Sequence, residues 1–276
     1  MRVFYIYFKF VLFLFISSVL NAKEEVPPKS IIAELDKMSH FTAFKDNYGT
    51  IGPTVGMRTT RYNSDARFQV SIKERFTPST LPHQTHLFMQ FTVTSYLDVF
   101  LPSFPLHDIS YNPGVGLGKH LIKEGKLVGY SYLMIEHESN GFDSEGEKSK
   151  SWNKISLAAT VQISRNVEVQ AKGWFPIIDG RYSKDILRYQ GLGFIASKVS
   201  TNNKRLNMSV LLTPTYRKRI GVNTNAEINY QLTNKRPVYV VAQYHNGYGE
   251  NLLDYHIYKS RLRIGFSIKP DGFYIF

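Results

Sequence analysis

Residues 154–163 have the sequence KISLAATVQI, in which apolar side chains recur at every second position. The apolar set is Ile155, Leu157, Ala159, Val161 and Ile163. A period of two predicts a β-strand with one apolar face and one polar face. Such a strand suits a soluble sandwich with its apolar face inward, or a transmembrane barrel with its apolar face toward lipid.

The same alternation recurs along the chain, and three features favour the barrel. The alternating runs extend over about ten residues, the length that a tilted strand needs to cross a bilayer. Their polar face carries Lys and Arg, which a wet lumen tolerates, and the chain ends in an aromatic residue, Phe276, as many outer-membrane barrels do. Turn-forming residues separate about twelve runs between Tyr48 and Ile268, and an even number suits antiparallel closure. We therefore predict an all-β fold, a transmembrane antiparallel β-barrel of about twelve strands.

The N-terminus predicts export and sets the domain boundaries. A basic start, Met1-Arg2, precedes an apolar run from Phe10 to Leu20 that ends in Asn21-Ala22. This pattern is typical of a cleaved secretory signal peptide, residues 1–22. Residues 23–46 then form a polar periplasmic lead-in, and the barrel occupies residues 47–276. Further along there is no apolar run of about 18 residues, so we predict that only strands cross the membrane.

Charge and cysteine content exclude some functions. The formal net charge is +12, but Lys and Arg are scattered along the chain, which argues against a nucleic-acid partner. We interpret the charge as loops near anionic lipid or lipopolysaccharide, with a surface that has no charged partner as the alternative. The absence of Cys excludes disulfides and thiol chemistry.

Three polar side chains lie at the tops of two neighbouring apolar stripes. Leu133 and Ile135 are predicted to face lipid, so His137 and Ser139 continue on that outward face. Asn153 lies two residues before Ile155 on the next strand, and a hairpin brings the two strand ends together. This places a hydroxyl nucleophile, an imidazole base and a side chain that can orient the imidazole on one surface. A His-x-Ser pair alone is weak evidence, because loop residues often share this spacing.

The surrounding residues resemble the outer membrane phospholipase A family. That family's active-site pattern is His-x-Ser-Asn-Gly, a variable loop, then Ser-x-Ser-Trp-Asn. It is matched here by His137-Glu138-Ser139-Asn140-Gly141 and by Ser149-Lys150-Ser151-Trp152-Asn153. A second match spans Gly247 to Tyr255, and a weaker one includes Tyr111-Asn112-Pro113. The similarity extends from about Phe41 to the end of the chain.

The resemblance implies a fold, a reaction and roles for individual residues. It implies a twelve-stranded barrel of the bacterial outer membrane that hydrolyses acyl esters of membrane phospholipids at either position, and of lysophospholipids. Ser139 would be the nucleophile, His137 the general base and Asn153 its orienting partner, with the oxyanion held by the Gly141 N–H. The family requires Ca²⁺ and acts as a homodimer. The ligands expected here are the Phe142 carbonyl, the Ser149 hydroxyl and Ser103 from the partner subunit. The loop also offers Asp143, Ser144, Glu145 and Glu147.

Some features depart from the family's pattern. The loop after Gly141 is slightly longer and more acidic, which leaves the full set of calcium ligands open. Where the family has a lipid-embedded Gln at the dimer contact, this chain has Val93. What stabilises the dimer is therefore also open.

Two alternatives to a hydrolase share the same barrel prediction. One is a non-catalytic porin or adhesin, and the other is a periplasmic barrel that carries lipid without cleaving it. The stretch Gly114 to Lys119 superficially resembles a phosphate-binding loop, but it falls within a predicted strand. We interpret its glycines as residues that allow close packing inside the barrel.

Overall fold

The computed structural model describes residues 29–142, 148–177, 183–217, 219–233, 236–270, 272–273 and 275–276. The expected signal peptide, residues 1–22, and the first part of the lead-in, residues 23–28, lie outside this part of the chain. The rest of the lead-in holds a helix, α2 (Lys29–Asp36), and a two-residue strand, β1 (Phe41–Thr42). No helix in the described ranges is both long and apolar enough to cross a membrane.

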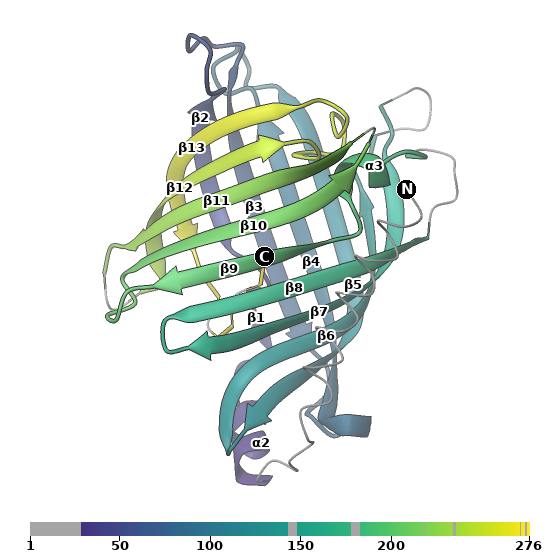
Figure 1. Cartoon of the computed structure of the whole chain (residues 1–276), viewed down its shortest axis with the longest axis vertical. Helices are drawn as coiled ribbons and strands as arrows, with labels where there is room; N and C mark the ends of the chain where they lie inside the picture. The colour runs from purple at the N-terminus through teal and green to yellow at the C-terminus, as the bar shows by residue number, and fades with distance from the viewer. Residues whose placement is uncertain are drawn as a thin grey trace.

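Twelve strands, β2–β13, form a closed antiparallel barrel, which confirms the predicted fold (Figure 1). Consecutive strands pair with each other, β13 pairs with β2 to close the ring, and β1 adds a short pairing to β3. Two short helices, η1 (Pro82–Gln84) and α3 (Leu187–Gln190), lie in connections. The barrel strands are β2 (Asn47–Pro53), β3 (Ser64–Arg75), β4 (Thr85–Leu97), β5 (Leu106–Lys123), β6 (Lys126–Ser139), β7 (Ser151–Ser164), β8 (Val167–Ile177), β9 (Gly193–Ser200), β10 (Leu206–Tyr216), β11 (Ile220–Gln231), β12 (Val238–Gly247) and β13 (Lys259–Ile268).

The two ends of the barrel differ in the length of their connections. One end carries residues 98–105, 140–150, 178–192 and 248–258, and we call it the long-loop end. The other carries tight turns such as 124–125 and 165–166, and we call it the short-turn end. Outer-membrane barrels have short periplasmic turns and long external loops. The long-loop end is therefore expected to face the outside of the cell and the short-turn end the periplasm.

The predicted alternation is realised around the ring. Ile135 and Phe266 point outward and are 63% and 61% exposed, whereas Glu136 and Ser267 beside them are buried. An outward apolar face suits lipid, and an inward polar face fills the lumen.

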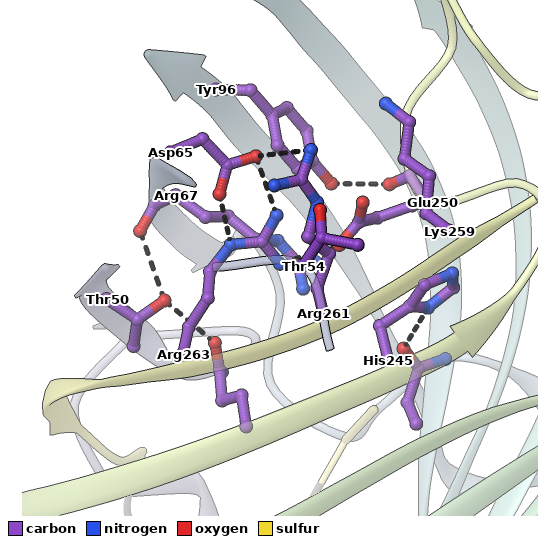
Figure 2. Close-up of polar contacts among 12 residues, drawn as sticks. Thr50, Thr54, Asp65, Arg67, Tyr96, His245, Glu250, Lys259, Arg261 and Arg263 are labelled. Atoms are coloured by element: carbon purple, nitrogen blue, oxygen red, sulfur yellow. Dashed lines mark hydrogen bonds and ion pairs between the residues drawn. The ribbon is translucent and has the colours of Figure 1, made fainter. Parts of the chain in front are cut away.

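The lumen near the long-loop end contains a paired ionic network (Figure 2). Arg263 donates from Nε and Nη2 to the two carboxylate oxygens of Asp65, at 2.7 and 2.9 Å. Its Nη1 donates to Glu250 Oε1 at 2.6 Å. Burial raises the pKa of Glu250, but the charge and hydrogen bond of Arg263, together with the nearby His245 and Arg67, outweigh this and lower that pKa to about 2. Buried charges persist when they are paired in this way.

The end of the chain returns into the barrel instead of extending the last strand. β13 stops at Ile268, close to the predicted limit, because Pro270 cannot donate to a strand ladder. Ile275 is buried in an apolar cluster with Phe44, Phe88 and Met134. The backbone N–H of Phe276 donates to Gln170 at 2.9 Å, and its ring packs edge-on against Phe194. The aromatic chain end therefore packs inside the barrel and is not part of the last strand.

Glycines on β5 allow the close packing expected of them. A Cβ added to Gly116 would lie 2.4 Å from the Leu133 carbonyl oxygen, and one added to Gly118 would lie 2.0 Å from the Tyr130 hydroxyl. Both contacts are far shorter than real Cβ atoms make. The segment is a strand, as predicted, and not a phosphate-binding loop.

We predict that Gly116→Ala destabilises the barrel, because the new methyl group meets backbone atoms of β6 that cannot move away independently. Overpacking of this kind costs about 1–3 kcal/mol. The measurement is the denaturant midpoint of detergent-folded protein. Val115→Ala, on the exposed lipid side of the same strand, is the control and should shift the midpoint less. Equal midpoints for wild type and Gly116→Ala would contradict the packing argument.

Candidate active site

The ends of β6 and β7 bring the predicted catalytic residues together on the outer wall. His137 pairs directly with Asn153 in the β6–β7 register, and Ser139 pairs with Ser151. His137 Nδ1 lies 2.8 Å from Asn153 Oδ1. Ser139 is two residues along from His137 on the same strand, so both side chains face the same side. That side also carries the exposed apolar residues Leu133 and Ile135.

The His137–Asn153 contact fixes the chemistry that the imidazole can perform. An amide oxygen only accepts hydrogen bonds, so Nδ1 carries the hydrogen and donates it. The remaining nitrogen, Nε2, then keeps its lone pair and can act as a base. The Ser139 hydroxyl, two residues away on the same face, would complete the predicted set of nucleophile, base and orienting group.

An interior carboxylate lies directly behind this outer site. Glu138, between His137 and Ser139, points into the barrel and accepts from Ser110 Oγ at 3.1 Å. It also accepts from Trp152 Nε1 and Lys154 Nζ, each at 3.0 Å. Trp152 and Lys154 are the two neighbours of Asn153, so one carboxylate holds the strand on both sides of that residue. We call Glu138, Trp152 and Lys154 the inner clamp.

Further contacts brace the inner clamp. Lys154 Nζ also lies 4.2 Å from the centre of the Trp152 ring. Trp152 is buried and packs with Ile186, Leu252 and Tyr255. Glu136, the next inward residue on β6, pairs with Lys172 at 2.7 Å. Alternation along β6 places Glu136 and Glu138 on the face opposite to His137, but their partners come from other strands and are not evident from the sequence.

The hairpin after Ser139 is tied at its base by Asn140, which is buried. Its side-chain oxygen accepts from the Lys150 N–H at 2.9 Å, and its Nδ2 donates to the Lys148 carbonyl at 2.8 Å. Gly141 follows with φ +68°, where a Cβ would lie 2.9 Å from the Tyr111 ring. Glycine is therefore required at the residue whose N–H is the predicted oxyanion donor.

The predicted calcium ligands lie around this hairpin. Phe142 and Ser149 are described, and both are half-buried, but residues 143–147 between them lie outside the described part. Ser103 is exposed in the β4–β5 connection, also at the long-loop end. Within the described ranges, no group of three or more His, Asp or Glu side chains is placed to hold a metal ion.

The C-terminal motif meets the first motif through Asp108, which is fully buried. One oxygen of Asp108 accepts from the Leu253 N–H at 2.9 Å, and the other lies 3.5 Å from Asn140 Nδ2. Asp254 accepts from His107 at 2.7 Å and from Lys259 at 2.8 Å. The hydrogen bond from His107 is the main reason that the pKa of Asp254 is lowered. The segment Gly247 to Tyr255 therefore supports the hairpin that carries Gly141.

Comparison with known proteins identifies the family. Residues 38–268 match the family model described as phospholipase A1. The phospholipase A1 of Klebsiella pneumoniae is 25% identical over 207 residues, which cover 73% of this chain and 69% of that protein. The Escherichia coli phospholipase A1 is 26% identical over 168 residues, which cover 59% of this chain and 54% of that protein.

Solved structures share the fold. Outer membrane phospholipase A from Escherichia coli superposes with a TM-score of 0.73 at 20% identity, covering 84% of this chain and 99% of that one. A calcium-bound dimer of the Salmonella typhi outer membrane phospholipase gives a TM-score of 0.74 at 20% identity, covering 87% and 97%. The chain thus belongs to the phospholipase A1 family and is a β-barrel phospholipase of the bacterial outer membrane.

Proposed function

We propose that this protein is a calcium-dependent phospholipase that hydrolyses sn-1 and sn-2 acyl esters of phospholipids and lysophospholipids through Ser139, His137 and Asn153. The observation that carries the proposal is the 2.8 Å contact between His137 Nδ1 and Asn153 Oδ1 on the lipid-facing wall. A lipid in the surrounding leaflet can reach this surface without leaving the bilayer.

The chain's own residues account for the proton transfers. His137 Nε2 removes the Ser139 hydroxyl proton as Oγ attacks the ester carbonyl carbon. The tetrahedral intermediate then expels the lysophospholipid alkoxide, which takes that proton from His137. Water attacks the acyl-serine in a second round, in which His137 again removes and returns a proton, and this releases the fatty acid and free Ser139.

Asn153 orients the imidazole but has no negative charge to stabilise the imidazolium. Stabilisation of the oxyanion must therefore contribute more, and the Gly141 N–H is the protein donor at that position. Oxygen donors are what Ca²⁺ prefers, and the Phe142 carbonyl and the Ser149 hydroxyl fit this chemistry. Bound there, with Ser103 of a second copy, Ca²⁺ would add positive charge near the oxyanion. The calcium-bound dimer of the Salmonella typhi relative supports this ligand and this assembly.

The lumen favours an enzyme over a porin. Near the short-turn end its interior is crossed by an apolar cluster that includes Phe44, Phe88, Tyr132 and Ile275. A porin needs a wet channel through the lumen. The polar surface that the fold presents to substrate is instead on the outside, at the ends of β6 and β7.

We predict that Ser139→Ala abolishes fatty-acid release from phospholipid by detergent-folded protein, and that a calcium chelator abolishes release by the wild type. The first change removes the nucleophile, and the second removes charge stabilisation of the oxyanion. Ser164→Ala, at the other end of β7, is the matched control and should retain activity. Release by Ser139→Ala at the wild-type rate would refute the nucleophile, and release in chelator would refute the metal dependence.

We also predict that Glu138→Gln lowers kcat by about tenfold with little change in KM, because the loosened inner clamp lets Asn153 drift from His137. Trp152→Phe, which removes one of the hydrogen bonds to Glu138, should lower kcat in the same way. Since both residues act on one contact, the double variant should lose less than the product of the single losses.

Glu168→Gln is the control for charge removal, because Glu168 pairs with Lys198 at 3.2 Å, near the short-turn end. It should leave kcat unchanged. Fully multiplicative losses in the double variant would argue against a shared positioning role. A change confined to KM would argue against it as well.

A further inference from the structure

A cationic cleft lies at the long-loop end, away from the catalytic hairpin. It has a volume of about 470 Å³ and lies among α3, the β10–β11 turn and the β12–β13 connection. Its lining includes Arg188, Arg217, Arg219 and His256, together with Tyr189 and Tyr248. No Asp or Glu is among its lining residues in the described part of the chain. We call this the arginine cleft.

Among the described residues, the three arginines have no carboxylate partner of the kind that some other arginines of this chain have. Arg263 and Arg75 each pair with a carboxylate. By contrast, no described carboxylate lies within ion-pair distance of Arg188, Arg217 or Arg219. Concentrated positive charge without an internal partner attracts an external anion.

One arginine of the cleft is held in a fixed position. The guanidinium carbon of Arg217 lies 3.6 Å from the centre of the Tyr248 ring. Tyr248 is in turn packed against Tyr189, at 5.4 Å between ring centres, and against Tyr258, at 5.3 Å. A stacked guanidinium loses little freedom on binding, and stacking leaves its in-plane N–H groups available to an anion.

The arginine cleft is at the level expected for lipid headgroups. Ile220 and Val222, at the start of β11, are 65% and 50% exposed on the lipid-facing side. Arg219 directly precedes this apolar stripe, so its charge lies where the hydrocarbon region gives way to headgroups. In Figure 1, α3 lies beside the end of β10 at this rim. Strands β10–β12 are separated from the catalytic pair β6–β7 by β8 and β9 on the shorter way around the ring.

From these observations we propose that the arginine cleft binds the phosphate groups of a phosphorylated glycolipid headgroup, the lipid A part of lipopolysaccharide, in the external leaflet. Arginine forks match phosphate oxygens with paired hydrogen bonds. Three arginines and a histidine around one cleft suit a headgroup with more than one phosphate better than a phospholipid with a single phosphate. The proposal does not depend on the hydrolytic mechanism.

The test uses delipidated full-length protein in detergent, with bound lipid counted by native mass spectrometry during titration with diphosphoryl lipid A. The double variant Arg217→Gln/Arg219→Gln should bind at least about tenfold more weakly, because charge-assisted hydrogen bonds to phosphate are lost. The matched control is Arg205→Gln. Arg205 also stacks on a tyrosine, at 5.3 Å from the Tyr230 ring centre, but it lies at the short-turn end. The affinity of the Arg205→Gln variant for lipid A should equal that of the wild type.

Parallel titrations with phosphatidylglycerol test the choice of ligand, and weaker binding than to lipid A is expected. Equal affinity for the two lipids would overturn the assignment to a glycolipid with several phosphates. Equal loss in Arg205→Gln would show that overall charge, and not the arginine cleft, binds the lipid. Unchanged binding by the double variant would overturn the site itself.

Thermal unfolding in lipid-free detergent shows whether the double variant is folded. If it is not, the single variant Arg219→Gln, at an exposed position, replaces it, with a smaller loss expected.

Discussion

Closure of the hydrogen-bonded ladder is the constraint on which the rest of this structure depends. In a closed antiparallel ring each strand residue faces either lipid or lumen, and the register between neighbours leaves no freedom to exchange the two. The pairing of His137 with Asn153 is one rung of that ladder. The proposed catalytic contact is therefore as well fixed as the backbone of β6 and β7, although it lies on the outer surface.

Because of the same constraint, the two faces of the barrel wall have different roles. His137, Ser139 and Asn153 face outward, and the residues between and beside them, Glu138, Trp152 and Lys154, face inward. An exposed site at a membrane surface has few neighbours to hold it in place. Here the rigidity comes from the lumen side, where charges are paired and aromatic rings are buried, and it reaches the outer face through the backbone.

Sequence patterns predicted the barrel, its strand limits and the meeting of His137 with Asn153, because each depends on parity and on a hairpin between adjacent strands. They did not predict the partners of Glu138, because Ser110 lies on β5 and is 28 positions distant in the sequence. They also missed the link from Asn140 through Asp108 to Leu253, which joins segments remote in the chain. The place of Phe276 could not be read from its type, since an aromatic residue suits a strand end and a buried cluster equally well.

The outward position of Ser139, the proposed nucleophile, changes which measure of substrate concentration matters for this protein. A pocket open to water meets substrate at a rate set by the concentration per volume of solution. A site on the barrel wall meets lipids that diffuse in the plane of the membrane, so the concentration per area of membrane sets the rate. The turnover rate should then follow the mole fraction of phospholipid in the leaflet around the barrel, however much lipid the suspension contains. In an external leaflet composed largely of glycolipid, the protein would be surrounded by molecules it does not cleave. It would begin to work when phospholipid mixes into that layer, so the composition of its two-dimensional solvent would itself act as the signal.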